Sequence, residues 1–203
     1  MEDLTTRDKI LKEAEQRFIA IGISNTQMKD IAEALKINRR TLYRYFPTKD
    51  ELAFEIELIV MSKIQEYMNI FIDGAEAGTG FQKVKVYFDM VDMDSIKELM
   101  KFTAEFDSYF RNDYPNKETE KSFLEILNPE NDALYRYISE GIADGSIRDD
   151  LSASELFSFI SHSFFALFQR LIMRENHLSR EYCEDIDFKQ VFRKVILSGI
   201  KKQ

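Results

Sequence analysis

Apolar residues recur every three or four positions along most of the chain, which is the spacing of one face of an α-helix. The first such stripe runs from Ile10 to Ile21 and is followed by Gly22, a residue that often ends helices. No stretch alternates apolar and polar residues as a half-buried strand does. The stripes predict an all-α fold with helices over 6–21, 27–35, 39–45, 49–72, 81–91, 118–127, 129–143, 155–174 and 187–201, and another that resumes after 92–95 and ends near 110.

Polar residues at the ends of these stripes predict where several helices begin. The Thr26 hydroxyl is placed to cap the second helix, because it can accept a hydrogen bond from the free amides of the first turn. Thr48 with Glu51, and Ser152 with Glu155, have the spacing of a capping box, in which each side chain bonds the backbone amide of the other residue. These two boxes predict the starts of the two longest helices.

The two short helices over 27–35 and 39–45 are joined by a three-residue break and follow a longer helix, which is the helix-turn-helix pattern. One apolar set would knit them together: Met28, Ile31, Ala32, Leu35, Ile37, Leu42 and Phe46. The side chains left outward on the second short helix are Arg39, Arg40, Thr41, Tyr43 and Arg44. Arginine can bind a guanine edge through two parallel hydrogen bonds, threonine can meet a base, and tyrosine suits phosphate. The pattern therefore predicts binding of double-stranded DNA.

Charge is distributed unevenly along the 203 residues, which carry 28 basic and 36 acidic side chains and a formal net charge of −8. Residues 1–50 are net positive, whereas the rest of the chain is strongly acidic. Between Lys36 and Lys49 there are five basic residues and no acidic one. A basic segment on an acidic body favours a polyanionic partner at one end. On charge alone a solvated face is the simpler interpretation, so the helix pattern carries the DNA prediction.

Residues 26–52, TQMKDIAEALKINRRTLYRYFPTKDEL, closely resemble the DNA-binding segment of the tetracycline-repressor-like (TetR) family of bacterial regulators. The run Thr41–Leu52 carries most of the resemblance, and Asp30–Ala32 also fits. Two positions depart from the family pattern. Lys36 stands where a glycine often occupies the turn, and Arg40 is bulkier than the small residue often found there.

This resemblance implies two domains. A helix-turn-helix DNA-binding domain would cover 1–48, with its motif at about 27–46, and a helical ligand-binding and dimerisation domain would cover 49–203, joined to it by the helix 49–72. Taken singly, Thr26 could be only a cap, Tyr45 only a brace and Lys49 only solvated. The residues at the DNA-contacting positions of the family, facing either the groove or phosphate, are Thr26, Lys29, Arg39, Arg40, Thr41, Tyr43, Arg44, Tyr45 and Lys49.

The helix 155–174 is apolar on more than one face. One face can fill the core of its own subunit, and the other then needs a partner. Helix-turn-helix proteins usually act as two-fold dimers, and the resemblance implies that the last two helices form a four-helix bundle with a second copy. A helix buried wholly within its own subunit is the alternative. The candidate residues of the homodimer interface are Phe157, Phe164, Phe165, Phe168, Phe192, Val195 and Ile196.

The middle of the chain is rich in methionine and aromatic residues, which can line an adaptable apolar pocket but are more often plain core. The resemblance implies a ligand cavity here, without naming a ligand. We expect no cofactor, but a small apolar or amphipathic effector. The candidate pocket residues are Phe88, Phe102, Phe106, Tyr109, Tyr137, His162 and Gln169, although a core or interface position is the simpler interpretation of His162.

A helical-bundle enzyme and a structural interaction protein are the alternative classes. Neither His162 nor His177 follows a glutamate at i−3, as a di-iron bundle requires, and no phosphate-binding G-x-x-x-x-G-K-[ST] motif occurs. A structural protein would leave the pattern of Arg39–Lys49 unexplained. We therefore expect no enzyme and no metal site, but a ligand-responsive repressor acting as a homodimer on an inverted-repeat operator. An activator, or a regulator without a ligand, is the nearest variant.

The sequence also bears on the cellular compartment. Cys183 is the single cysteine, which excludes an intrachain disulfide and fits a reducing compartment. The first residues, MEDLTTRDK, show no secretory signal. The longest uncharged apolar stretch, between Glu155 and Arg170, has 14 residues, whereas a membrane crossing needs about 20. We expect a cytoplasmic protein with no membrane partner.

Overall fold

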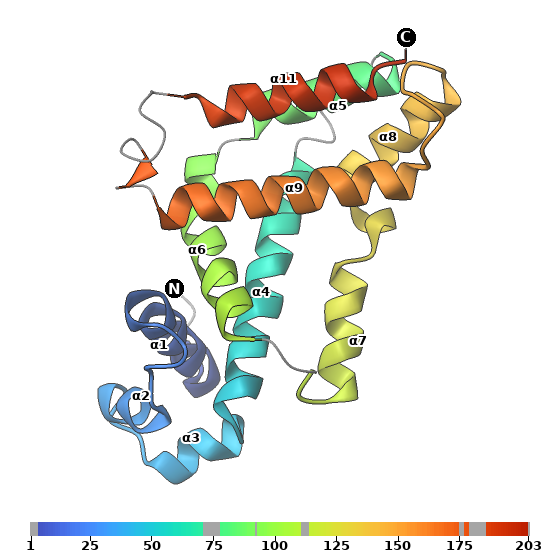
Figure 1. Ribbon diagram of the computed structural model, residues 1–203. Coiled ribbons are helices and arrows are strands. Elements are labelled where there is room, and N and C mark those ends of the chain that lie inside the picture. The colour runs from blue at the N-terminus through green and yellow to red at the C-terminus, as the bar shows by residue number, and fades with distance from the viewer. Residues whose placement is uncertain are drawn as a thin grey trace. The chain divides into compact units, whose positions relative to one another are not determined.

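The computed structural model describes residues 4–70, 78–91, 93–110, 114–174, 177–178 and 186–202. Within these residues every regular element is a helix, apart from an isolated bridge between Ile147 and Lys201 (Figure 1). The predicted all-α fold is confirmed. The elements are α1 Thr6–Ile21, α2 Met28–Ala34, α3 Arg39–Tyr45, α4 Lys49–Asn69, α5 Gly80–Met90, α6 Met93–Tyr109, α7 Lys117–Ile126, η2 Pro129–Asn131, α8 Ala133–Ala143, α9 Ala153–Met173 and α11 Phe188–Ile200.

Most predicted helix bounds agree with the structure to within two residues. The predicted helix 129–143 is divided, because Asn128 caps the short 3-10 turn η2 and Asp132 then caps α8. The predicted end of the fourth helix at 72 and the position of Cys183 lie outside the described residues.

The chain forms two compact units. Unit 1 consists of Met1–Lys63 and Glu98–Ile126, and unit 2 of Ile64–Lys97 and Leu127–Gln203. Helices α4 and α6 therefore contribute residues to both units. The predicted division of function at residue 48 follows the helix-turn-helix motif and stays a prediction.

Unit 1 is built around the apolar stripe of α1. Ile10, Ala14 and Phe18 are fully buried, and the Phe18 ring lies 6.3 Å from that of Phe102 in α6. Of the apolar set expected to knit the helix-turn-helix together, Met28, Ile31, Ala32, Leu42 and Phe46 are buried. Burying this stripe is what holds two seven-residue helices in place, because helices so short are marginal by themselves.

The predicted capping role of Thr26 is wrong. Helix α2 is capped by Gln27, which makes no side-chain bond to the helix. The Thr26 side chain is 1% exposed, and its hydroxyl donates to the Gly22 carbonyl at 2.9 Å. The same carbonyl also accepts from the Thr26 amide at 3.1 Å, and the side-chain bond turns the hydroxyl away from the first turn of α2. The side chain is thereby buried and not presented to a phosphate.

Of the two predicted capping boxes, the one at Ser152 is complete, and the one at Thr48 contributes the bond made by the Thr48 hydroxyl. The Thr48 hydroxyl accepts a hydrogen bond from the Glu51 amide at 3.1 Å, at the start of α4. Ser152 and Glu155 form the complete capping box at the start of α9. Each bond satisfies an amide of the first helical turn that would otherwise lack a partner.

Unit 2 is organised around α8, which packs against both α5 and α9. Helices α9 and α11 lie side by side and run in opposite directions (Figure 1). The Phe192 ring of α11 lies 5.8 Å from Phe164 and 6.1 Å from Phe168, both in α9. An aromatic seam thus joins the last two long helices inside one chain.

This seam divides the predicted interface residues. Phe164, Phe168 and Ile196 are buried within the chain, which corrects their assignment to a partner surface: the inner stripe of α9 and α11 fills the core of unit 2. Phe157, Phe165 and Phe192 are half-buried. Val195 is 61% exposed, and Phe159, which was not assigned to the interface, is 66% exposed.

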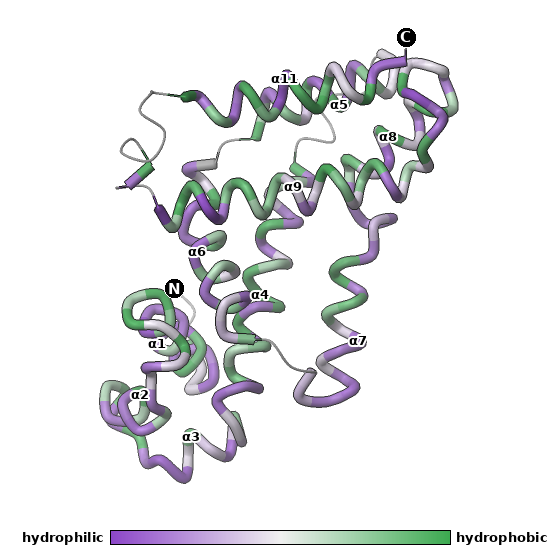
Figure 2. Tube along the Cα trace, viewed as in Figure 1, coloured by the Kyte–Doolittle hydropathy of each residue, from purple (hydrophilic) through white to green (hydrophobic). Residues whose placement is uncertain are grey.

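Helix α9 carries many apolar residues along its length (Figure 2). Among the described residues it is the one helix long and apolar enough to cross a membrane, judged by length and composition alone, and 22% of its most apolar 18-residue stretch is buried inside the chain. Leu156, Ile160 and the two inward phenylalanines occupy the core, as in the central helix of a bundle. On its outward face Phe159 is 66% exposed and Met173 is 54% exposed in the described part of the chain.

The turn between α2 and α3 contains backbone strain at Lys36. Its φ is 54°, the one positive value at a non-glycine residue in the described part of the chain. The Ile37 amide reaches back to the Ala32 carbonyl at 3.0 Å, which closes the helix C-terminus in the manner usually served by glycine.

We expect Lys36→Gly to raise the free energy of unfolding by about 1 kcal/mol, because it relieves the left-handed conformation of a side-chain-bearing residue. Urea denaturation monitored by circular dichroism measures the change. Lys36→Ala is the matched control, since it removes the same charge but keeps the Cβ atom. A variant with glycine no more stable than the alanine variant would contradict the strain argument.

Candidate DNA-binding site

Helix α3 is divided sharply between a buried and an exposed face. Leu42 is 0% exposed and Phe46, just beyond the helix, is 2% exposed. Arg39, Arg40 and Arg44 are exposed on the other face, together with Tyr43 and Tyr45, and Thr41 is half-buried. The Asn38 side chain caps the helix by accepting from the Arg40 amide at 2.8 Å. The predicted groove-facing side chains thus share one surface of a helix whose other surface is fixed in the core.

The exposed face is positively charged and lightly restrained. Arg39 makes a 3.3 Å ion pair with Glu33 of α2, in which both side chains are mostly exposed. The Arg44 guanidinium lies 5.6 Å from the centre of the Tyr45 ring. Lys29 is exposed on α2. Exposed ion pairs of this kind are weak, so the guanidinium groups can exchange their partners for phosphate or base edges at small cost.

Lys49, at the start of α4, is half-buried, and its ammonium group already donates hydrogen bonds to backbone carbonyls. It donates to the carbonyls of Ile23 at 2.6 Å, Thr26 at 3.1 Å and Ser24 at 3.2 Å. Burial lowers the pKa of Lys49, and the nearby Asp50 carboxylate opposes that shift. The bonds show that Lys49 ties the α1–α2 loop to the start of α4, which replaces the predicted role of a free phosphate ligand with a structural one.

Helix α6 supports the same loop. The Glu105 carboxylate accepts from the Ile23 amide at 2.7 Å. The Tyr109 hydroxyl donates to Asp50 at 2.8 Å, and the Lys49 ammonium lies 5.3 Å from the centre of the Tyr109 ring. Burial, followed by the bond to Asp50, raises the pKa of Tyr109 to about 12, so it remains a hydrogen-bond donor at neutral pH. These contacts position the helix-turn-helix from behind.

Comparison with known proteins agrees with this geometry. The family model of bacterial regulatory proteins of the tetR family matches residues 10–56, which contain most of α1, all of α2 and α3, and the start of α4. The transcriptional regulator TcmR of Streptomyces glaucescens is 42% identical over 48 residues, 24% of this chain and 21% of TcmR. The chain belongs to the TetR family.

The likeness of this TetR-family chain extends beyond the helix-turn-helix. The transcriptional repressor KstR2 of Mycolicibacterium smegmatis is 27% identical over 165 residues, 76% of this chain and 73% of KstR2. The transcriptional regulator FadR of Bacillus subtilis, solved in complex with stearoyl-CoA, superposes with a TM-score of 0.65 at 20% identity, over 95% of this chain and 98% of FadR. The family is one of DNA-binding transcriptional regulators and not of enzymes, so the enzyme alternative is set aside.

The predicted pocket residues of this TetR-family regulator fall in both units. Phe102, Phe106 and Tyr109 belong to unit 1, and the other four belong to unit 2. Phe88, Phe102, Phe106 and Tyr137 are buried, Tyr109 and Gln169 are half-buried, and His162 is exposed on α9. Their role in ligand binding stays a prediction.

The roles of several residues near the site could not be predicted from the spacing of apolar and polar positions along the chain. Asp50, Glu105 and Glu57 act through tertiary contacts that no local pattern encodes. Glu57 gives the one available hint, since it is an acidic residue on the apolar stripe of α4 between the buried Phe54 and Val60. Within the described residues no group of three histidine, cysteine, aspartate or glutamate side chains is placed to hold a metal ion.

We expect Lys49→Met to lower the free energy of unfolding by about 2 kcal/mol, because three carbonyls lose a charged donor. It should also weaken DNA binding, since the α1–α2 loop loses its anchor. Chemical denaturation and a DNA-binding titration measure the two effects.

The matched control is Lys29→Met, which removes an exposed lysine of α2. It should leave stability unchanged and, where Lys29 meets a phosphate, reduce the salt slope of DNA binding by about one. A Lys49→Met protein of wild-type stability would return Lys49 to the group of direct phosphate contacts.

Proposed function

We propose that this TetR-family regulator is a ligand-responsive repressor that binds an inverted-repeat operator as a homodimer in the bacterial cytoplasm. The observation that carries the proposal is the exposed, acid-free basic face of α3, set on a buried Leu42 and Phe46. Such a helix fits the major groove, where arginine and threonine can read base edges.

The proposed DNA contacts fall into two groups, those to base edges and those to phosphate. Arg39, Arg40, Thr41 and Arg44 are proposed to approach base edges from α3, and Lys29, Tyr43 and Tyr45 to bind the phosphate backbone. Base contacts determine sequence preference, whereas phosphate contacts fix register and make affinity depend on salt.

The outward faces of α9 and α11 support the homodimer. Phe159 and Val195 are more than half exposed, as is Met173, and Val191 is 47% exposed. Large apolar patches on a regulator are costly to leave in water, and a second copy can cover them through a self-complementary contact. Two copies would present two α3 helices to half-sites about 34–36 Å apart.

The repressor role and the response to a ligand are supported by relatives. KstR2 is named as a repressor, and FadR has been solved with stearoyl-CoA. A ligand that binds more tightly to a form with another spacing of the two recognition helices would lower operator affinity by that difference in binding free energy.

The test is binding of the full-length protein to DNA from immediately upstream of its own gene, over a salt series, with footprinting. We expect protection of an inverted repeat, and at least a tenfold loss of affinity in Arg44→Ala, corresponding to about 1.4 kcal/mol for one lost base contact. Arg136→Ala removes an exposed arginine of α8 and should bind like wild type. Absence of binding to pooled genomic fragments at low salt would reject the regulator function.

A further inference from the structure

Helices α4 and α6 run in opposite directions through unit 1, and their side chains meet in successive layers. The rings of Phe54 and Phe106 lie 4.9 Å apart, edge to face. One turn after Phe54 in α4 and one turn before Phe106 in α6, Glu57 is hydrogen-bonded to the hydroxyl of Thr103. A carboxyl group therefore occupies the layer directly beside an aromatic one.

The Glu57 carboxyl is incompletely satisfied. Its residue is 1% exposed, and its Oε2 atom has no hydrogen-bond partner. Burial, with the Asp107 carboxylate as the second cause, raises the pKa of Glu57 to about 9, so the group is neutral at pH 7. The bond between Glu57 and the Thr103 hydroxyl lowers the pKa and so opposes the shift only in part, and the same hydroxyl also lies 3.3 Å from the Leu99 carbonyl. Oε2 is then left as an acceptor that faces no donor.

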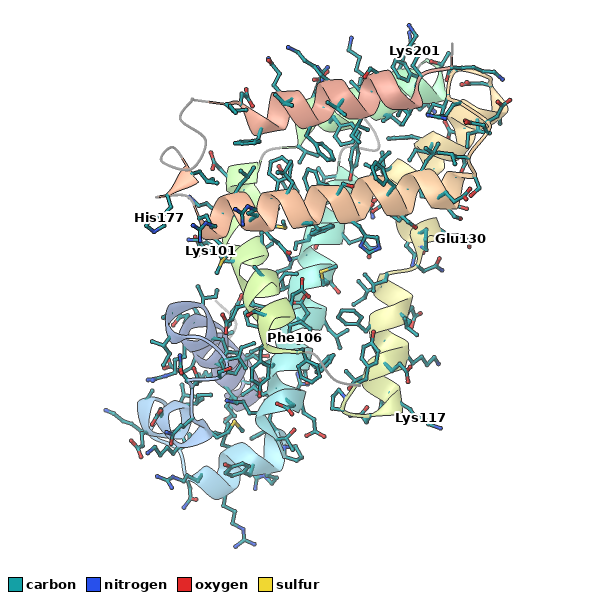
Figure 3. The ribbon with its side chains drawn as sticks, in the orientation of Figure 1. Lys101, Phe106, Lys117, Glu130, His177 and Lys201 are labelled. Atoms are coloured by element: carbon teal, nitrogen blue, oxygen red, sulfur yellow. The ribbon has the colours of Figure 1, made fainter. Side chains whose placement is uncertain are left out.

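Aromatic rings surround the neighbouring layer. The Phe54 ring lies 4.1 Å from Phe110, 5.6 Å from Tyr114 and 6.3 Å from Phe123, measured between ring centres. Phe54 and Phe106 are buried, whereas the other three rings are half-buried (Figure 3 labels Phe106). No residue of α7, which supplies Phe123, is buried. The cluster is therefore closed at α4 and α6 and least covered at α7.

We propose that Glu57 and the aromatic cluster around Phe54 form a binding site for a lipophilic ammonium ion, which enters on the α7 side. The ammonium N–H would donate to Oε2, and the ring faces would attract the positive charge and cover the apolar body. The Asp107 carboxylate favours a cation for the same reason. This inference rests on the proposed function, in that the occupant of the site is the effector of the repressor.

Binding of the cation is coupled to a proton. An ammonium ion pairs best with an ionised Glu57, so the carboxyl releases its proton as the ligand enters. As the pH increases, the affinity for the ammonium should then rise about tenfold per pH unit, up to the pH at which Glu57 ionises by itself. A neutral ligand of the same shape leaves the proton in place, and its affinity is independent of pH.

The experiment is isothermal titration calorimetry of the full-length protein without DNA. The probes are 1-naphthylmethylammonium, the neutral 1-naphthylmethanol and stearoyl-CoA. We expect the ammonium to bind at least tenfold more tightly than the alcohol at pH 8, with roughly a hundredfold gain between pH 6 and pH 8. Glu57→Gln should abolish both the preference and the pH dependence. Glu66→Gln, which removes an exposed acid of the same helix, should change neither.

Equal affinity of the ammonium and the alcohol, tighter binding of stearoyl-CoA alone, or unchanged ammonium binding in Glu57→Gln would each overturn the cation site. The outcome is separate from that of the operator test, because no DNA is present. Ammonium binding that follows Glu57 but leaves operator affinity unchanged would keep the site and reject its role as the effector site.

Discussion

Gly80→Ala lowers the free energy of unfolding by about 3 kcal/mol, the expected cost of forcing two packed helices apart. A Cβ atom at Gly80 would overlap the backbone nitrogen and Cα of Gly141 in α8 and lie 2.5 Å from the Tyr137 carbonyl oxygen. These are backbone atoms, which cannot move aside as a flexible side chain does. The helix start is also tied down, since the Gly80 amide donates to Asp144 at 2.7 Å. Urea denaturation of the two proteins gives the difference.

The matched control for this substitution is Gly199→Ala in α11. A Cβ atom at Gly199 would meet nothing within 4 Å, so the variant should gain about 0.5–1 kcal/mol from the better helix propensity of alanine. A Gly80→Ala protein as stable as wild type would show that α5 and α8 lie further apart than the structure places them.

Glu57→Gln should become increasingly stabilising as the pH rises. The pKa of Glu57 is about 9 in the folded protein and ordinarily 4.5, so the folded state holds a proton that the unfolded state has released. The contribution of the protonated Glu57 to the free energy of unfolding is fully present below pH 4.5 and is lost as the pH rises towards 9. Between pH 5 and pH 8 the wild type should lose about 4 kcal/mol relative to the glutamine variant, at about 1.4 kcal/mol per pH unit.

Denaturation curves of both proteins at pH 5, 6, 7 and 8 measure this effect, and taking the difference removes the titration of every group that the two proteins share. Glu66→Gln on the exposed part of α4 should give a flat difference. A flat difference for Glu57→Gln as well would mean that water or a charged partner reaches the carboxyl in the folded protein.

Local patterns predicted the helices of this protein well, because burial of one stripe per helix determines both its length and its orientation. The bounds of α1 and α3 agree with the prediction, and so does the capping box at Ser152. Thr26 shows where such reasoning fails. Its spacing fits a cap, but a carbonyl at the end of the preceding helix competes for the same hydroxyl.

The DNA-binding surface was predictable for a similar reason, since Leu42 and Phe46 orient α3 and leave its arginines outward. Lys49 and Glu57 were not. Their partners lie far away in the sequence, at Ile23 and at Thr103, so only the folded chain reveals that one is a clamp and the other a buried acid. The buried and exposed apolar residues of α9 could not be distinguished either, because the spacing of apolar positions does not indicate which face of the helix a second copy would cover.

Four hydrogen bonds from α4 and α6 hold the main chain of the α1–α2 loop. The Lys49 ammonium donates to the carbonyls of residues 23, 24 and 26, and the Glu105 carboxylate accepts from the amide of residue 23. Side chains of the loop contribute as well, since the Asn25 amide group donates to the Ile21 carbonyl at 2.8 Å, the Thr26 hydroxyl donates to the Gly22 carbonyl, and Ile23 is fully buried. The sequence of the loop is therefore constrained together with its path. Helices α2 and α3, which follow the loop, should therefore be transferable between regulators only where Ile23 and Thr26 are kept together with Lys49 and Glu105.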